Sequence, residues 1–185
     1  MIEIRKYQPK DKENVLKILF ETSSMPIETE DQREFLMLMF NDYYTEVEAD
    51  SCFVAVNEND EAVGYILCAR NFDEYYKNFK RFYLPEIREL GLNYYVMAMG
   101  EIFVHRIYRK KYPAHLHIDI LETCQGQGVG RRLVSALSEH LSKTGTHGLM
   151  LSCGMGNKGA IKFYEKNNFK KQMNFMGSYL MAKDI

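Results

Sequence analysis

The chain has 185 residues, of which 46% are hydrophobic and 26% charged, and its formal net charge is −1. Such a chain suits one globular domain with a substantial core, which we expect to span residues 1–185. The near-zero charge gives no general attraction to nucleic acid or to an anionic membrane, and no apolar run approaches the ~20 residues that cross a bilayer. We therefore expect neither nucleic acid nor a membrane as a partner.

Secretion and a disulfide-stapled fold are disfavoured as well. The N-terminal segment MIEIRKYQPKDKEN lacks the apolar core of a secretory signal. The four cysteines are widely spaced and form no CxxC pair, which argues against a zinc site and against a disulfide framework. We therefore predict a cytoplasmic protein without a metal site. The cysteines are Cys52, Cys68, Cys124 and Cys153.

The first third of the chain predicts a strand, two helices and a hairpin. Apolar and polar side chains alternate at the N-terminus, as in a half-buried strand, and Pro9 ends that run. Two apolar runs further on are joined by a polar turn that is typical of a β-hairpin. The expected elements are a strand at 2–7, helices at about 15–20 and 31–44, and strands at 52–57 and 62–69.

Residues 70–112 carry an aromatic stripe at helical spacing, interrupted by Pro85 and Gly91. We interpret this stripe as packing, although an aromatic insertion between strands could also form the floor of a substrate pocket. The stripe consists of Tyr75, Tyr76, Phe79, Phe82 and Tyr83.

The last third predicts alternating strands and helices. Gly145 stands where the cap at the C-terminal end of a helix is expected. The order of all elements makes an α/β domain with a mixed sheet. The expected elements are strands at 114–121 and 148–153, helices at about 129–143 and 157–167, and a closing strand at 175–182.

A glycine-rich segment, QGQGVGR at 125–131, lies between a predicted strand and a predicted helix. Glycines let the main chain approach a ligand closely, and the free N–H groups of a helix N-terminus bind phosphate oxygens. The segment is neither a Walker loop nor a good dinucleotide fingerprint, because glycine recurs at every second position. A glycine-rich turn without a ligand is the plain structural alternative.

Two motifs in this region resemble the Gcn5-related (GNAT) acetyltransferases. Gln125-x-x-Gly128-x-Gly130 matches the Q/R-x-x-G-x-G/A signature of the family's pyrophosphate loop for coenzyme A. Asn157-x-x-Ala160-x-x-x-Tyr164, followed by Asn168-Phe169, is similar to a second family motif that ends in Gly-Phe. The match covers about residues 114–170. Asn in place of that Gly tolerates the left-handed conformation.

The resemblance implies a mixed, mostly antiparallel central sheet flanked by helices, in which the fourth and fifth strands, 114–121 and 148–153, splay apart to admit acetyl-CoA. It also implies direct transfer of the acetyl group to a primary amine, without a metal. The residues to which it assigns cofactor binding are Ile118, Asp119, Ile120, Gln125, Gly126, Gln127, Gly128, Val129, Gly130, Arg131, Asn157, Ala160, Phe163 and Tyr164.

The resemblance also assigns roles in the reaction. The main chain of residues 118–120 polarises the thioester carbonyl, and a fixed N–H is the donor that a developing oxyanion needs. Tyr164 stands where many members place the acid that protonates the departing thiolate. Simple packing of an amphipathic helix is the alternative explanation for Tyr164.

The general base is not settled by the motifs, because this strand lacks the glutamate of the protein-lysine branch. Alternation places His115, His117 and Asp119 on one face of the strand. His117 or Asp119 could act as the base; alternatively the three form a structural polar cluster, and a His-x-His metal site is the poorest explanation.

Two functions follow from these motifs. The first is an N-acetyltransferase that acts on a small-molecule or peptide amine; fold does not identify the acceptor. The second is a non-catalytic acetyl-CoA-binding or interaction domain, since the segment YPAHLHIDIL resembles histone-acetyltransferase-like domains found beside some glycosidases. Because both family motifs are complete, they favour the enzyme over the non-catalytic domain. The oligomeric state is open, with a homodimer as one option.

Overall fold

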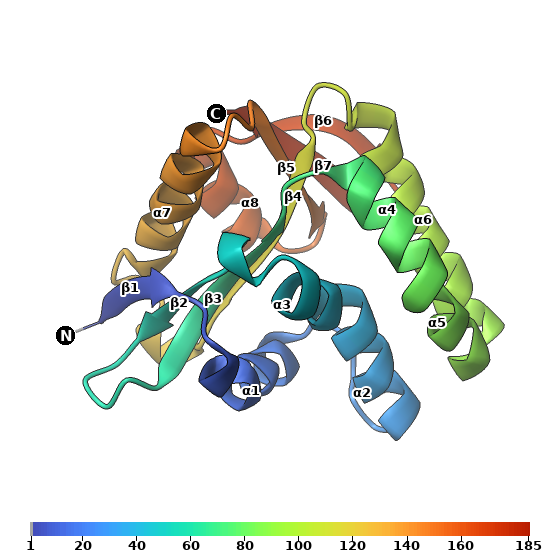
Figure 1. Cartoon of the computed structure of the whole chain (residues 1–185), viewed down its shortest axis with the longest axis horizontal. Helices are drawn as coiled ribbons and strands as arrows, with labels where there is room; N and C mark the ends of the chain where they lie inside the picture. Colours follow the sequence, from blue (N-terminus) through green and yellow to red (C-terminus); the bar gives the residue numbers. More distant parts are fainter. Residues whose placement is uncertain (1) are drawn as a thin grey trace. The chain divides into compact units, whose positions relative to one another are not determined.

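The computed structural model, whose helices and strands are labelled in Figure 1, describes residues 2–185 and contains two compact units. The first comprises Met1–Cys68 and His117–His140, and the second Ala69–Leu116 and Leu141–Ile185. Within residues 2–185, no helix is long and apolar enough to cross a membrane. The single domain expected from the sequence stays a prediction, and each unit is described by itself.

The strands follow the order β1-β2-β3-β4-β5-β7-β6. The pairs β1–β2, β2–β3, β5–β7 and β6–β7 are antiparallel, whereas β4 and β5 are parallel. The mixed, mostly antiparallel sheet expected from the sequence is confirmed. The strands are β1 (Glu3–Lys6), β2 (Phe53–Val56), β3 (Ala62–Ala69), β4 (Ala114–Ile120), β5 (Gly148–Gly154), β6 (Lys170–Phe175) and β7 (Ser178–Asp184).

In the first unit, the predicted hairpin of β2 and β3 is confirmed. Its turn is held by Asn57, whose Oδ1 accepts hydrogen bonds from the N–H groups of Asn59 and Glu61 at 3.0 Å each. Every residue of β3 is buried, which explains its nearly continuous apolar sequence. The helices of this unit are α1 (Lys12–Thr22), α2 (Glu30–Met37), α3 (Tyr43–Val47) and α7 (Val129–Lys143), the last three residues of α7 belonging to the second unit.

The second predicted helix is interrupted by a π-helical segment. Thr29 caps α2 in a reciprocal capping box with Gln32, as the sequence Thr-x-x-Gln allows. The chain then widens into a π-turn at Leu38–Asp42 before α3 begins. Such segments are frequent at functional sites, and this one carries Phe40 and leads directly into Tyr44.

In the second unit, the aromatic segment folds into three helices. Asn71 caps α4 by accepting hydrogen bonds from two N–H groups of the first turn, and Gly91, at a φ of 148°, separates α5 from α6. Tyr75 and Phe79 are buried, so the packing interpretation of the stripe holds for them. The helices are α4 (Phe72–Phe82), α5 (Leu84–Leu90), α6 (Leu92–Tyr108) and α8 (Lys158–Lys166).

The closing strand predicted at 175–182 is present as β7 (Ser178–Asp184), but it begins three residues later than predicted and follows a strand, β6, that was not predicted. Met176 and Gly177 take φ angles of 45° and 80°, and this left-handed pair turns the chain between β6 and β7. Strand β6, with the sequence KKQMNF, escaped notice because its apolar and polar residues do not alternate. The predicted caps are confirmed, since Gly145 and Asn168 have φ angles of 78° and 68°.

Candidate functional site

The glycine-rich segment forms an open loop at the start of α7. Gly126 and Gly128 take left-handed φ angles of 74° and 76°, which glycine adopts without strain. A Cβ atom on either residue would meet nothing within 4 Å, so the main chain there faces open space. A ligand can therefore approach the peptide groups of this loop closely.

The first turn of α7 supplies donors for an anion. The N–H of Arg132 donates to the carbonyl of Gly128 at 3.1 Å, and this is the bond that starts the helix. The N–H groups that precede it have no acceptor within the helix, and the helix dipole makes them favourable for negative charge. Because the side chain of Arg131 is exposed beside them, the loop fits a pyrophosphate.

Two glutamine side chains brace the loop from within. Gln125 Nε2 donates to the carbonyl of Ile120 at 3.0 Å, and Gln127 Nε2 donates to the carbonyl of Thr123 at 3.0 Å. The family signature has Gln or Arg at the first of these positions, and in this chain the Gln side chain holds the loop in place. Gln125 ties the loop to the end of β4.

Gly64 lets strand β3 run close to the end of β4. A Cβ on Gly64 would lie 3.0 Å from Ile120 Cγ1 and 3.2 Å from the carbonyl oxygen of Asp119. The N–H of Leu121 donates to the carbonyl of Val63 at 3.0 Å. The main chain at 119–121, which leads into the loop, is therefore held firmly by β3.

His117 lies between two aromatic side chains, Phe40 in the π-turn and Tyr44 just after it. Its Nε2 is 2.9 Å from the hydroxyl of Tyr44, and its ring packs edge-on against Tyr44 and Phe40, with centroids 5.1 and 4.9 Å away. Tyr44 is buried, whereas His117 is half-buried. The hydroxyl of Tyr44 therefore fixes the ring of His117 and biases its tautomer.

Asp119 has a perturbed carboxyl group. The hydroxyl of Tyr65 donates to Asp119 Oδ2 at 2.5 Å, and Tyr65 is fully buried on β3. The residue retains some exposure, but its carboxyl group is enclosed by protein atoms. Burial raises the pKa of Asp119 to about 6, and hydrogen bonds from Tyr65 and Thr22 partly offset that rise.

His115 belongs to the second unit and has different surroundings. It is buried, and its ring lies 4.4 Å from Tyr75, 5.9 Å from Phe72 and 5.2 Å from His105. These partners come from α4 and α6. The sequence left open whether the polar face of His115, His117 and Asp119 is catalytic or structural, and the structural role suits His115. His117 and Asp119 are instead paired with tyrosines of the first unit.

The second family motif lies on α8. Asn157 is the N-cap of this helix, because its Oδ1 accepts a hydrogen bond from the N–H of Ala160 at 2.9 Å. Tyr164 is buried and packs against Phe163 and Phe169, with ring centroids 5.3 and 5.7 Å away. Both residues thus have clear structural parts within their own unit, and a part in catalysis stays a prediction.

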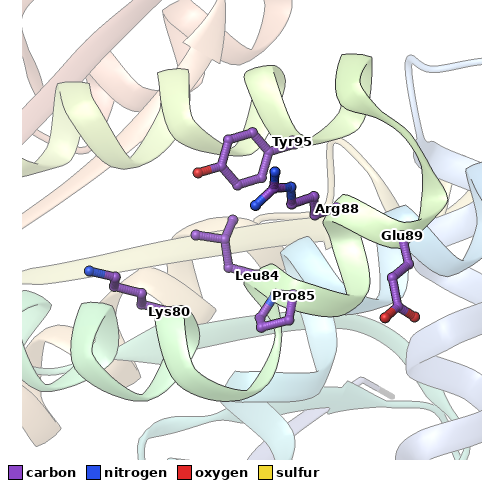
Figure 2. Close-up of a pocket in the computed structure, with 6 residues that line it drawn as sticks. All are labelled: Lys80, Leu84, Pro85, Arg88, Glu89 and Tyr95. Carbon is purple, nitrogen blue, oxygen red and sulfur yellow. The ribbon is translucent and has the colours of Figure 1, made fainter.

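An open hollow of about 490 Å³ lies among the three helices α4, α5 and α6 (Figure 2). The guanidinium of Arg88 lies 5.7 Å from the ring centre of Tyr95, and the two side chains point toward one another, while Glu89 points away from them. The residues that line the hollow are Lys80, Leu84, Pro85, Arg88, Glu89 and Tyr95.

Sequence patterns did not identify the residues that hold His117 and Asp119. Tyr44 and Tyr65 lie 73 and 54 positions away from their partners, in elements outside both motifs. In the sequence, both tyrosines look like ordinary apolar positions of a helix and a strand. Among residues 2–185, no group of three or more His, Cys, Asp or Glu side chains could hold a metal ion.

Comparisons with known proteins agree with this geometry. A model of the Acetyltransferase (GNAT) family matches residues 13–169. Similar solved structures include SsHAT (23% identity, TM-score 0.88, covering 99% of this chain and 98% of that chain). Another is PaiA N-acetyltransferase from Thermoplasma acidophilum in complex with coenzyme A (16%, 0.63, 100% and 99%). A third is the polyamine N-acetyltransferase of Drosophila melanogaster (13%, 0.69, 100% and 100%). Because all three identities are below 25%, this similarity shows that the proteins share a fold and shows nothing further.

Proposed function

Since this chain belongs to the acetyltransferase (GNAT) family, we propose that it is an N-acetyltransferase acting directly on a primary amine. The observation that carries the proposal is the open glycine loop at the start of α7, where Gly126 and Gly128 leave the main chain accessible to an anionic ligand. The carboxyl group of Asp119, bonded to Tyr65 and raised in pKa to about 6, supports it. A carboxyl group with a pKa near the working pH is suited to proton transfer. The family match runs through both units, so we propose that residues 1–185 act as one domain.

The loop after β4 is the proposed site for the donor. Acetyl-CoA, the donor of this family, supplies an activated acetyl group when it is bound. Within the segment Gln125 to Arg131, the N–H of Gln125 donates to the carbonyl of Glu122 at 3.1 Å. The N–H groups that follow it would bind the pyrophosphate, because they combine open glycine backbone, a helix N-terminus and a cation. The main chain of 118–120 would position and polarise the acetyl carbonyl.

Asp119 is the proposed general base. Above about pH 6 its carboxylate is ionised and can accept the proton of the attacking amine. Tyr65 holds the carboxylate in one orientation through its hydrogen bond to Oδ2. His117, held by Tyr44, is the second candidate for this role or lies beside the acceptor.

Tyr164 is the proposed general acid, and Asn157, Ala160 and Phe163 complete the proposed cofactor contacts on α8. This assignment rests on the family motif, and the packing of Tyr164 against Phe163 and Phe169 supports it by holding the phenol in place. Asn157 would act through its side chain while its Oδ1 also caps α8.

The acceptor is proposed to be a small-molecule or peptide amine. Proteins of this fold include N-acetyltransferases for agmatine and for polyamines, which supports an amine as acceptor without identifying it. A cytoplasmic location is part of the proposal, because all four cysteines are free thiols.

Calorimetric titration with acetyl-CoA tests the donor site. We expect micromolar binding by the wild type and at least a ~100-fold weaker affinity for Gly128→Asp, because a carboxylate would repel the pyrophosphate and strain a residue with a φ of 76°. Val47→Asp, an exposed change elsewhere in the first unit, is the control and should bind normally. Absence of binding by a folded wild type would refute the donor site.

Release of free thiol in the presence of an amine panel then tests catalysis. We expect turnover with at least one primary amine from a set of polyamines, agmatine, amino acids and peptides. Binding without amine-dependent thiol release across the panel would instead support the non-catalytic acetyl-CoA-binding domain.

A further inference from the structure

Helix α6 carries an exposed apolar stripe that takes no part in the proposed reaction. We call the four residues Leu92, Val96, Phe103 and Ile107 the α6 stripe; their exposed fractions are 72%, 50%, 51% and 51%. At about 100° per residue, the four positions fall within about 60° of one another around the helix axis. A helix in a globular protein normally turns such a stripe toward a core.

The neighbours of α6 leave most of the stripe exposed. Tyr95, which is not part of the stripe, faces Arg88 of α5 (Figure 2). Phe103, a member of the stripe, contacts Phe175 of β6 at 5.5 Å between ring centroids and is still 51% exposed. A Cβ on Gly100 would lie 3.0 Å from Met176 Sδ, so the glycine lets Met176 lie against the middle of the helix. Met176 is 67% exposed and thus extends the apolar surface at the midpoint of the stripe.

The stripe is symmetric about the middle of the helix. Leu92 and Ile107 are equally far in sequence from the midpoint between Met99 and Gly100, and so are Val96 and Phe103. The two pairs are also symmetric around the axis, because both are centred on the same direction. A two-fold axis through that midpoint would therefore set Val96 opposite Phe103, and Leu92 opposite Ile107, in two antiparallel helices. This is the self-complementary pattern that an isologous interface requires.

We propose that the chain forms a homodimer in which α6 packs antiparallel against α6 of a second copy through the α6 stripe and Met176. Five side chains that each expose on the order of 100 Å² offer roughly 500 Å² per subunit, or about 1,000 Å² in total, which is about the least that a specific interface buries. The charged residues of the helix, Glu101 and Arg106, lie outside the stripe. A centre free of charge is typical of the core of an interface.

Light scattering coupled to size exclusion tests the interface at tens of micromolar protein. We expect the wild type at twice the chain mass of 21.7 kDa. The variant Val96→Glu/Phe103→Glu should be monomeric, with a dissociation constant raised at least about 100-fold, because it places like charges opposite each other twice. Val47→Glu is the matched control, since Val47 has the same 50% exposure as Val96 but lies on α3. It should remain a dimer.

A charge-complementary variant tests the antiparallel register itself. In Val96→Lys/Phe103→Glu, the two new charges are about 10 Å apart within one helix, too far to pair. Across the proposed two-fold axis, each introduced lysine would instead face the glutamate introduced in the second copy. This variant should therefore dimerise, while the variant with two glutamates does not. Circular dichroism and acetyl-CoA binding check that each variant is folded.

A monomeric wild type would overturn the proposal, as would a double-glutamate variant that stays dimeric. A dimer that is broken equally by the double-glutamate and the lysine–glutamate variants would exclude this register. Because none of these measurements involves turnover, their outcome is independent of the proposed reaction.

Discussion

Strand β4 contains two polar side chains whose surroundings differ in kind. His115, near its start, is packed among the rings of Phe72, Tyr75 and His105. Asp119, near its end, accepts hydrogen bonds from Tyr65 and Thr22 and keeps some exposure. Alternation along the strand gives both residues the same face, and the elements packed against each residue decide what it does. A shared face of a strand therefore predicts the direction in which two side chains point, but it does not predict what each side chain does.

The largest effect should come from removing the carboxylate. In Asp119→Asn we expect kcat to fall by about 100-fold to 10,000-fold, the range typical of a general base, while acetyl-CoA affinity stays within about threefold. Steady-state thiol release and calorimetry on the same preparation measure the two quantities. His115→Gln is the contrasting variant, and it should retain most of its activity per folded molecule. Equal losses in both variants would remove the distinction between the two ends of the strand.

The stability of the fold, in contrast to activity, should depend strongly on His115 and only weakly on His117. His115→Ala leaves a cavity among aromatic rings, so we expect its free energy of unfolding to fall by about 2–4 kcal/mol. His117→Ala, at a half-buried position, should cost less than about 1.5 kcal/mol. Urea denaturation of the two variants measures both values. A cost at His117 as large as that at His115 would mean that both histidines serve the core.

The motifs predicted the part of the site that local sequence can specify. Gly126, Gly128 and the start of α7 depend on left-handed φ angles and helix capping, and the glycines at these positions report both requirements directly. The positive φ of Asn168 was predictable for the same reason. A local backbone conformation can thus be predicted from the sequence wherever only one or two residue types adopt it easily.

The partners of β4 were not predictable, because they are brought close by tertiary packing. Tyr65 reads as one more apolar position in a buried strand, and nothing local marks it as the donor to Asp119. The π-turn at Leu38–Asp42 keeps an apolar pattern that also fits an α-helix. Strand β6 was missed because its polar sequence lacks alternation. The splay of β4 and β5 beyond the pairs Ala114–Leu149 and His115–Met150 stays a prediction.

The pKa of Asp119 implies that this residue destabilises the fold when it is charged. Its folded value of about 6 lies above the ordinary 3.8, so the cost is absent below about pH 4 and fully present above about pH 6. We expect Asp119→Asn to gain about 1–3 kcal/mol of stability at pH 8, and the gain to vanish as the pH falls to about 4. Thermal melts at both pH values measure this. A pH-independent difference would mean that the carboxyl group titrates normally.

Tyr65→Phe should have the smallest effect and the most specific one. The hydrogen bond from Tyr65 lowers the pKa of Asp119. Loss of this hydrogen bond should therefore raise that pKa and shift the midpoint of the ascending limb of the pH–rate profile to a pH above about 6. We expect a decrease in kcat of about tenfold or less near pH 7, which is recovered in part at about pH 8.5. Tyr44→Phe, which changes the partner of His117 instead, should leave the limb in place.

The most direct test of the account is the pH dependence of kcat/KM for amine acetylation, measured for the wild type and for Asp119→Asn. With Asp119 as the base, the wild type should show an ascending limb centred near pH 6, and the residual activity of the variant should lack that limb. An ascending limb near pH 6 that persists in a folded, acetyl-CoA-binding Asp119→Asn variant would contradict the account and transfer the role of base to another group.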